Sequence, residues 1–243
     1  MKFMMFKLYS SVCRENSSNC SYPNSIDVVD EAALASAVSH DYVGAKYKGN
    51  YRKKENFEES NCLIMDCDNN HTDNPDEWVS ISTLKRDFPE VTFAIHYSRN
   101  NMKPKDGKTA RPKFHVFFPI DHVNNTDKYS AMKEQVLMIA PYFDNKAKDA
   151  ARFFFGTENP KVEIISGTKN LTQFLSECQT ANIGQIVQNK ANVIPVSMHS
   201  EITTENLHNY SRSSEAQEVI PIGQRNNTMH DTCLQPDNKI REY

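Results

Sequence analysis

The chain has 243 residues, of which 38% are hydrophobic, so it can bury one sizeable core with a short appendage. Its formal net charge of -3 argues against a protein that coats nucleic acid through bulk positive charge, which leaves local basic patches for that purpose. Its 6 cysteines include no C-x-x-C pair, which argues against a zinc site and favours free thiols in the cytoplasm.

The N-terminal sixty residues predict a strand, a helix and a connection. The opening MKFMMFKLYSSV is apolar, is too short to span a membrane and lacks the cleavage site of a secretory signal. We interpret it as the first β-strand of a cytoplasmic protein with no membrane partner. Residues 25–40 place apolar side chains at helical spacing behind Ser25, a suitable N-cap, and residues 41–61 are polar and lysine-rich.

The middle of the chain alternates between β-branched or aromatic segments and segments with helical spacing. The expected elements are a strand at 62–68, a helix at about 75–87, strands at 91–98 and 114–120, a helix at 125–142, and strands at 152–156 and 161–166. The strands at 91–98 and 114–120 predict a hairpin around a basic loop, with the second strand ending at Pro119. This order of elements predicts an α+β fold.

Two acidic residues end the predicted strand CLIMDCD. Because side chains alternate along a strand, Asp66 and Asp68 point to the same face. Two such carboxylates repel each other unless a cation lies between them, and carboxylate oxygens are the ligands that Mg²⁺ and Mn²⁺ prefer. The pattern therefore favours a divalent metal site, and its alternative is a strand that ends in a solvated acidic turn.

A histidine lies within the apolar strand that follows the basic loop. Lys113 and His115 share one face of this strand, opposite Phe114. A cationic group beside a proton donor suits the phosphates of a nucleoside triphosphate. The alternative for His115 is a hydrogen-bonded core histidine, but an inward-facing Lys113 needs a partner and so favours the phosphate site.

A third acidic residue follows an apolar pair in the sequence Tyr142-Phe143-Asp144. Asp144 could complete a site of three carboxylates, and Asp149 is its rival for that place. Arg152, at the start of the predicted strand RFFFG, could reach a phosphate or a template backbone. The alternative is an acidic helix end in which Asp149 and Arg152 pair across one turn.

The order of these features is more specific than any one of them. A DxD strand, a hairpin with a basic loop and a strand histidine, and a hydrophobic-Asp pair resemble the archaeo-eukaryotic primase superfamily, whose motifs run DxD or DxE, s-x-H, and hydrophobic-Asp. The segments IMDCDNN, HYSRN, RPKFHVFFPID and FDNKAKDAARFFFG resemble the primase-polymerases of bacterial plasmids, phages and integrated mobile elements. The resemblance covers about residues 60–160.

The resemblance implies a catalytic core of the primase or RRM-like type, with a mixed β-sheet flanked by helices. It also implies two divalent ions, Mg²⁺ or Mn²⁺, bound by Asp66, Asp68 and Asp144. Lys113 stands where s-x-H has a small residue, which is a departure from the family's pattern. The expected catalytic residues are Asp66, Asp68, Asp144 and His115.

The same resemblance assigns substrate contacts to the basic segments. The expected nucleotide-binding residues are His115, Lys113, Ser98, Arg99 and Arg152. The expected DNA-binding residues are Lys48, Arg52, Lys53, Lys103, Lys105 and Arg111, which would contact backbone phosphates and carry little sequence information. Solvated loops are the alternative reading of these charged runs.

The composition changes after about residue 170. We expect a catalytic domain at 1–170 and a partly helical linker, rich in Asn, Gln, Ser and Thr, at 171–214. The sequence VIPIGQRNNTM resembles the start of the small helical domain that follows such catalytic domains, so 215–243 is expected to be a truncated form of it.

The expected function is therefore that of a DNA primase-polymerase, which transfers nucleotides from (d)NTPs to a 3′-hydroxyl by a two-metal mechanism. Its expected partners are a single-stranded DNA template with primer and, in replication, a replicative helicase. The alternatives are a metal-dependent nuclease or phosphodiesterase, and a catalytically inactive module that binds single-stranded DNA. Triphosphate-dependent primer extension separates these functions.

Overall fold

The computed structural model describes residues 5–105 and 107–191, with side chains up to residue 181. The described residues up to Gln185 belong to one compact unit. The elements are β1 (Phe6–Ser10), β2 (Asn24–Val28), α1 (Glu31–Ala37), β3 (Tyr42–Val43), β4 (Lys46–Tyr47), η1 (Lys48–Asn50), η2 (Lys54–Asn56), β5 (Phe57–Cys67), η3 (Pro75–Glu77), α2 (Ile81–Asp87), β6 (Phe93–Tyr97), β7 (Phe114–Val123), α3 (Thr126–Ile139), η4 (Asn145–Lys148), β8 (Val162–Ile165) and α4 (Leu171–Ala191). None of the helices described is long and apolar enough to cross a membrane.

The strands form two sheets, and the predicted α+β class is confirmed. The larger sheet has five strands in the order β4-β5-β7-β6-β8, and the smaller has three in the order β2-β1-β3. A mixed sheet was expected, whereas the named strand pairs are antiparallel. The parallel pairing in the described residues is an isolated bridge between Val91 and Lys169. The predicted hairpin of β6 and β7 is confirmed.

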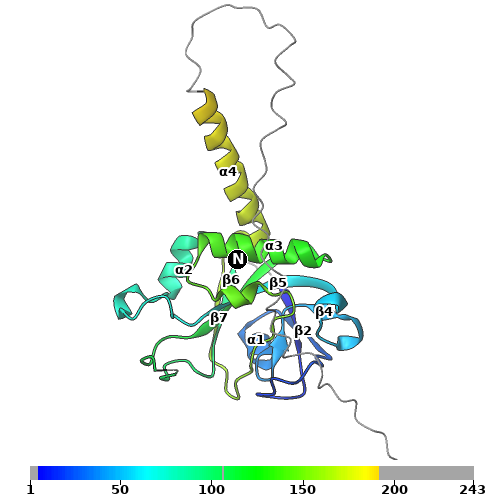
Figure 1. Cartoon of the computed structure of the whole chain (residues 1–243). Coiled ribbons are helices and arrows are strands. Elements are labelled where there is room, and N and C mark those ends of the chain that lie inside the picture. The colour runs from blue at the N-terminus through cyan, green and yellow to red at the C-terminus, as the bar shows by residue number, and fades with distance from the viewer. Residues whose placement is uncertain (1–4, 106, 192–243) are drawn as a thin grey trace, which may run out of the picture. The chain divides into compact units, whose positions relative to one another are not determined.

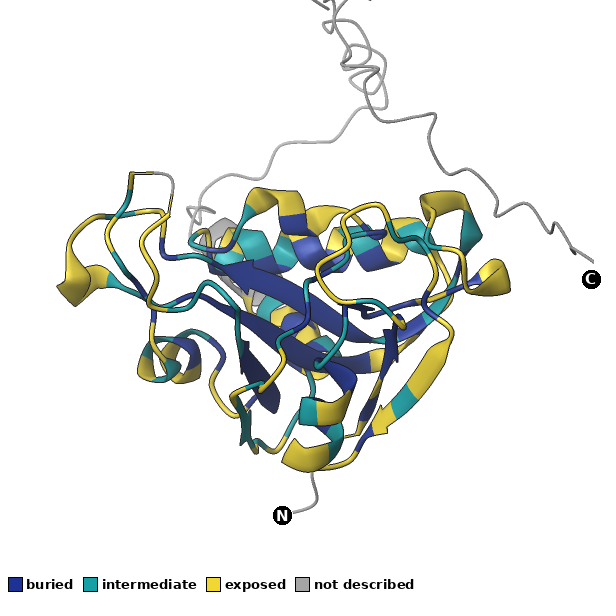
Figure 2. Cartoon of the chain, turned by 90° about the horizontal axis from the view of Figure 1, so that it is seen from below, coloured by how far each residue is buried: buried dark blue, intermediate teal, exposed yellow. Residues whose placement is uncertain are grey.

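Alternation along the central strands directs side chains to two separate cores. On one face of the large sheet, Leu63 and Met65 pack with residues of α2, α3 and the start of α4. On the other face, Ile64 and Phe117 pack with residues of β1 and α1. Figure 1 shows α2 and α3 on one side of β5, β6 and β7, and α1 with β2 on the other. Figure 2 shows the buried central strands between these more exposed layers.

The strand register places three polar residues side by side across the large sheet. Asp66 of β5 lies opposite His115 of β7, and His115 lies opposite His96 of β6. Directly paired residues of neighbouring strands point to the same face, so these three side chains form one row. Asp66 has the same alternation as Ile64, and His115 the same as Phe117, so the row faces the smaller sheet.

The predicted helix at 25–40 was wrong over its first part. Residues Asn24–Val28 form β2, in which Ser25 pairs with Tyr9 of β1. Helix α1 begins later, and its N-cap is Asp30, whose side chain accepts a hydrogen bond from the backbone N–H of Ala33. The apolar residues of this short segment are compatible with either a helix or a strand, and it forms a strand because it pairs with β1.

Three further expectations about strands were wrong. Strand β7 continues beyond Pro119 to Val123, because the register with β5 shifts between Ser60 and Cys62 and the ladder there tolerates a missing N–H. The polar connection at 41–61 contains β3, β4 and the first part of β5. The predicted strand at 152–156 is reduced to one bridge between Tyr42 and Phe154.

The segment expected to be a partly helical linker begins with α4, which extends from Leu171 to Ala191. Leu171, Phe174 and Leu175 are buried in the core, so the first turns of this helix cover the sheet. The rest of the expected linker and the expected truncated domain at 215–243 lie outside the described residues.

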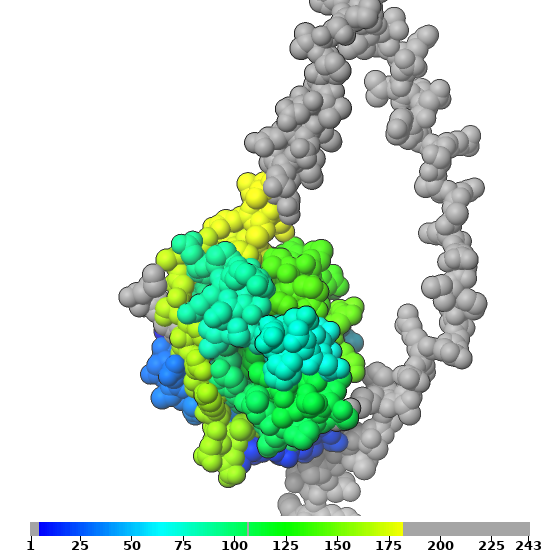
Figure 3. Space-filling model, turned by 90° about the vertical axis from the view of Figure 1, so that its left-hand side faces the viewer, coloured from blue at the N-terminus to red at the C-terminus, as the bar shows by residue number. Residues whose placement is uncertain are grey.

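Two loops meet at one end of the large sheet. Lys108, in the loop between β6 and β7, donates from Nζ to the backbone carbonyl of Asn70, in the loop after β5, at 3.1 Å. Figure 3 shows the loop after β5, in cyan, against the green of the β6–β7 loop. One loop follows the strand that carries Asp66 and the other precedes the strand that carries His115, so they frame one side of the candidate site.

Candidate active site

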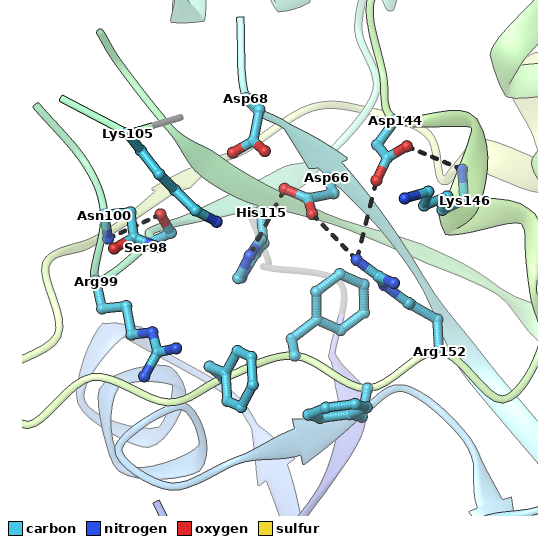
Figure 4. Close-up of a pocket in the computed structure, with 13 residues that line it drawn as sticks. Asp66, Asp68, Ser98, Arg99, Asn100, Lys105, His115, Asp144, Lys146 and Arg152 are labelled. Atoms are coloured by element: carbon cyan, nitrogen blue, oxygen red, sulfur yellow. Dashed lines mark hydrogen bonds and ion pairs between the residues drawn. The ribbon is translucent and has the colours of Figure 1, made fainter. Parts of the chain in front are cut away.

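A pocket of about 330 Å³ opens at the end of the row formed by Asp66 and His115. Figure 4 shows carboxylates along one part of its wall, basic side chains at both ends and aromatic rings below. The residues that line it are Asp66, Asp68, Ser98, Arg99, Asn100, Lys105, His115, Asp144, Lys146, Arg152, Phe153, Phe154 and Phe155. The structure thus brings together seven residues expected for metal or nucleotide binding, which are Asp66, Asp68, Ser98, Arg99, His115, Asp144 and Arg152.

The backbone holds Asp144 beside Asp66. The backbone N–H of Asp144 donates to the carbonyl of Asp66 at 2.8 Å, which fastens the loop before η4 to the end of β5. Asp144 is also the N-cap of η4, and its Oδ1 accepts from the backbone N–H of Lys146 at 3.0 Å. Its rival Asp149 lies at the other end of η4 and does not line this pocket.

Arg152 lies between two of the carboxylates without a close bond to either. Its Nη2 is 3.8 Å from Oδ2 of Asp66 and 3.9 Å from Oδ2 of Asp144. Its Nε is buried and has no hydrogen-bond partner among the described residues. Both distances exceed a hydrogen bond, so the guanidinium compensates the carboxylate charges only in part.

Asp66 carries the clearest sign of crowded negative charge. Its burial, and then the charges of Asp68 and Asp144, raise the pKa of this carboxyl to about 7, while Arg152 opposes the shift. Only 9% of Asp66 is exposed. A cation bound beside Asp66 would therefore relieve a repulsion that the protein alone leaves in place.

The donor chemistry of these three carboxylates fits Mg²⁺ or Mn²⁺. Among the described residues no group of three or more His, Cys, Asp or Glu side chains is placed to hold a metal ion by itself. Mg²⁺ commonly uses one or two carboxylates and takes its remaining ligands from water and substrate phosphates. An open set built from Asp66, Asp68 and Asp144 fits that manner of binding, in which substrate completes the site.

His115 is buried and hydrogen-bonded on the side away from the pocket. Its Nδ1 lies 2.6 Å from the hydroxyl of Tyr42, and its Nε2 lies 3.7 Å from Oδ1 of Asp66. Burial, and then the neighbouring His96 and Arg152, lower the pKa of His115 well below the usual value for histidine. It is therefore a neutral imidazole that presents Nε2 to the pocket.

The opposite wall of the pocket is aromatic. Phe153 and Phe155 are half-buried, and their ring centroids lie 5.1 Å apart. The guanidinium of Arg99 lies 4.2 Å from the ring centroid of Phe155, and that of Arg52 lies 4.7 Å from Phe153. Arginines over the ring faces keep these partly exposed rings in place.

Two of the expected substrate contacts lie elsewhere. Arg111 is fully buried, donates to the carbonyls of Asn69 and Thr72, and pairs with Asp73 at 2.8 Å. Its side chain is therefore not accessible to DNA in this structure. Lys113 is also buried, and its Nζ lies 4.0 Å from Oδ1 of Asp68, where its charge offsets part of that of the carboxylates, but it does not line the pocket.

The other expected DNA contacts are at or near the surface. Lys48, Lys53 and Lys103 are exposed, and Lys105 lines the pocket. Arg52 is half-buried and donates from Nη1 to the carbonyl of Ala151 at 3.0 Å, so it supports the aromatic wall.

Several pocket residues could not be expected from the sequence. Phe153 and Phe155 fall in a segment whose pattern predicts a strand, and no pattern in the sequence marks Asn100 or Lys146. Tyr42, which bonds to His115, is 73 positions away in the chain, so no local pattern connects the two. A histidine at alternating spacing in VTFAIHYS was the available signal for His96.

Comparison with known proteins gives one distant likeness. No family model and no curated protein matches this sequence. Among solved structures, the primase-polymerase (PrimPol) of cyanophage S-2L, AEP domain PP-N190, aligns over 71% of this chain and 88% of that one, with 12% identity and a TM-score of 0.39. A likeness of this size carries no argument about function, which has to come from the site itself.

Proposed function

We propose that this protein is a template-directed nucleotidyltransferase of the primase-polymerase type, which adds nucleotides from (d)NTPs to a 3′-hydroxyl. The observation that carries the proposal is the composition of the pocket, where Asp66, Asp68 and Asp144 face basic side chains and His115 across about 330 Å³. Carboxylates alone would suit a bare cation, and basic groups alone would suit a bare phosphate. Both together suit a phosphate chain that arrives with a divalent cation.

In this proposal the basic side chains of the pocket bind the phosphates of a triphosphate. Arg99 and Lys105 stand at one end of the pocket, and Arg152 and Lys146 at the other, as Figure 4 shows. His115 between them offers a neutral hydrogen-bonding nitrogen. When bound, divalent cations at the carboxylates would neutralise charge on the triphosphate and on the departing pyrophosphate. The protein's own residues would align the triphosphate and hold the attacking 3′-hydroxyl beside it.

The aromatic wall gives the remainder of a nucleotide a place to bind. Phe153 and Phe155 leave ring surface facing the pocket, and base or sugar groups can pack on such surface whatever the base is. We infer that the phosphates lie toward the carboxylates and the nucleoside toward Phe153 and Phe155. Such sequence-tolerant packing suits an enzyme whose template selects the nucleotide.

The DNA would reach the pocket across nearby basic groups. Lys48, Lys53 and Lys103 are exposed and can contact backbone phosphates. We leave Arg111 out of this set because it is buried. A replicative helicase remains a partner expected from the sequence resemblance.

The direct test is synthesis on single-stranded DNA. The purified full chain is incubated with template, Mg²⁺ or Mn²⁺, and either dNTPs or NTPs, with and without a primer. Template-dependent products that require the cation and a triphosphate are the expected result. Degradation of the template without triphosphate would indicate a nuclease, and binding of single-stranded DNA with no product under any condition would indicate a non-catalytic module.

Asp144 and Asp149 form a matched pair for this test. They cap opposite ends of η4, and only Asp144 lines the pocket with Asp66. Asp144→Asn should remove most synthesis, because one of three cation ligands loses its charge, whereas Asp149→Asn should retain it. Equal losses in the two variants would indicate that the loop, rather than the Asp144 carboxylate, is what matters.

A further inference from the structure

A buried row of hydrogen bonds lies behind His115. The hydroxyl of Tyr42 is 2.6 Å from Nδ1 of His115 and 3.0 Å from Nδ1 of His96. On the far side of its ring, His96 places Nε2 3.0 Å from Oγ1 of Thr157. Tyr42 and His96 are fully buried, so water does not compete for these bonds. The row runs from Thr157 through His96 and Tyr42 to His115 and ends at the pocket.

The protons in this row can be counted. A histidine ring whose Nδ1 accepts a hydrogen bond carries its N–H on Nε2, whereas a neutral ring whose Nδ1 donates has a bare Nε2. Burial lowers the pKa of His96 to about 4, so that ring carries one N–H. The Tyr42 hydroxyl has one proton and lies between two Nδ1 atoms, so it donates to one and accepts from the other. Two arrangements satisfy every bond, and they run in opposite directions along the row.

The two arrangements differ at the ends of the row. In one, Thr157 donates to His96, His96 to Tyr42 and Tyr42 to His115, which leaves the Nε2–H of His115 facing the pocket. In the other, His115 donates from Nδ1 to Tyr42, Tyr42 donates to His96, and His96 donates to Thr157. The Nε2 of His115 then has no proton, and its lone pair faces Oδ1 of Asp66 at 3.7 Å. An N–H directed toward carboxylates is attracted, whereas a lone pair directed toward them is repelled. The first arrangement also uses the Thr157 proton, and the short 2.6 Å contact fits a phenol that donates.

We propose that Tyr42 and His96 are positioning residues, which hold His115 as the Nε2–H tautomer so that it donates a hydrogen bond to a phosphate oxygen of the bound nucleotide. The identity of the ligand rests on the proposed function, whereas the tautomer rests on the geometry alone. His115 thus serves as an uncharged donor with a fixed direction beside the carboxylates.

The fold holds Tyr42 at the required place. Its backbone N–H and carbonyl each bond to Phe154 at 2.9 Å, and its ring stacks on that of Phe154 at 5.7 Å. Gly156 lies two residues further on, and a Cβ there would be 2.4 Å from the backbone of His40, so only glycine permits this approach. The segment that carries Arg152 into the pocket is therefore fastened to the residue that orients His115.

The tautomer can be read by NMR on the ¹⁵N-labelled full chain. Two-bond correlations between ring protons and nitrogens distinguish a protonated from an unprotonated nitrogen in each histidine. The expected result for the wild type is a protonated Nε2 and a bare, hydrogen-bonded Nδ1 in His115. A protonated Nδ1 in His115 would overturn the inference, whether or not the protein synthesises DNA.

Tyr42→Phe removes the hydroxyl and keeps the stacked ring. We expect the Nδ1 resonance of His115 to move toward that of a nitrogen without a hydrogen bond, and the second tautomer to become populated. Tyr129→Phe is the matched control, because Tyr129 is equally buried and its hydroxyl donates to the carbonyl of Cys62 at 2.9 Å. An unchanged His115 in Tyr42→Phe, or an equal change in Tyr129→Phe, would contradict the positioning role.

A second variant covers the case in which Tyr42→Phe does not fold. Thr157→Val removes the first donor of the row at a half-buried position, and Thr157→Ser retains it. We expect Thr157→Val to change the Nε2 resonance of His96 and to populate the second tautomer of His115 in part, with Thr157→Ser resembling the wild type. Identical spectra for the wild type, Thr157→Val and Thr157→Ser would contradict a hydrogen-bond chain that runs from Thr157 to His115.

Nucleotide binding provides the second readout. The KM for dATP should rise about tenfold in Tyr42→Phe with kcat nearly unchanged, because one hydrogen bond to a charged group weakens. Direct titration with dATP and Mg²⁺ should show a matching loss of affinity. If the wild type has the expected tautomer but dATP leaves the His115 Nε2–H resonance unmoved, the nucleotide assignment fails while the tautomer stands.

Discussion

Arg111 and Arg152 have the same side chain in two contrasting environments. Arg111 is buried, and all three of its guanidinium nitrogens donate hydrogen bonds, to carbonyls, to a threonine hydroxyl and to the Asp73 carboxylate. Arg152 has a buried Nε without a partner in the described part of the chain, and it approaches two carboxylates at 3.8 and 3.9 Å. The protein thus supplies a hydrogen-bond acceptor for each guanidinium nitrogen of Arg111, but not for Nε of Arg152.

We infer from this difference that Arg111 is a structural cation and that Arg152 is a candidate contact for a ligand. A buried donor without a partner costs free energy, so a fold that leaves one beside crowded carboxylates has not reached its lowest electrostatic energy. Phosphate oxygens and a divalent cation would supply what Arg152 and Asp66 lack. Arg111 needs no such ligand, because its donors are already bonded.

Removal of the carboxylate charge should have the largest effect. In Asp66→Asn with Asp68→Asn, synthesis should fall by at least about a thousandfold, because cation binding is lost. The free energy of unfolding should stay equal or rise, since the raised pKa of Asp66 reports unrelieved burial and repulsion. Urea unfolding and primer extension measure the two quantities. Asp76→Asn, in the exposed η3, is the control. A double variant that extends primers at the wild-type rate would show that the site is elsewhere.

Arg111→Met should mainly reduce stability. The carbonyls of Asn69 and Thr72 would lose their donor in a buried place, so we expect unfolding to become easier by about 3 kcal/mol. Urea denaturation measures this, with Arg86→Met, an exposed ion-pair variant, as the control whose stability should stay close to that of the wild type. If Arg111→Met were stable but bound DNA weakly, Arg111 would be a DNA contact rather than a structural cation.

Arg152→Met should show the opposite pattern to Arg111→Met. Stability should change by less than about 1 kcal/mol, because its ion pairs with Asp66 and Asp144 are long. The KM for the triphosphate should rise about 10- to 30-fold, because one phosphate contact is lost. Arg152→Lys, which keeps the positive charge, should show a smaller rise of KM than Arg152→Met. If Arg152→Met unfolds as readily as Arg111→Met, the contrast between the two arginines fails.

Lys133 offers a third, intermediate case. Its Nζ donates to the carbonyls of Ala147 and Asp149 at 2.8 and 3.1 Å, and burial lowers its pKa from 10.5 to about 7. Between these pH values the unfolded chain binds a proton that the folded chain does not. Stability should therefore rise with pH from about 7 upward, by at most about 1.4 kcal/mol per pH unit. Chemical unfolding at pH values of about 7.5 and 8.5, inside this window, measures the rise.

Lys133→Met is the control for that pH dependence. The variant should lose the rise with pH, because it has no proton to exchange at this position. It should also loosen η4, since the carbonyls of Ala147 and Asp149 lose their donor. If the wild type and the variant share the same slope, another group is responsible for the titration.

The sequence alone predicted the alternation along each central strand, which puts Asp66 on one face with Asp68, and His115 on one face with Lys113. The pairing of β5 with β7 then put Asp66 and His115 side by side. The nearly continuous apolar runs that precede Asp66 and surround His115 indicate strands buried on both faces. Local patterns also predicted the β6–β7 hairpin and the segments that became α2, α3 and β8. They favoured Asp144 over Asp149 as the third carboxylate, and that choice stays a prediction. These features depend on neighbours in the chain, so a local pattern contains them.

Tertiary structure decided the features that depend on distant partners. Pairing with β1 made residues 24–28 a strand, although helical spacing from residue 25 predicts a helix there. Burial turned Arg111 from an expected DNA contact into a support for two loops. Tyr42 and His115 meet across 73 positions, and the aromatic wall faces the carboxylates because Phe154 bonds to Tyr42. A side chain's partners across the fold set its charge, tautomer and exposure, and neither composition nor spacing records those partners.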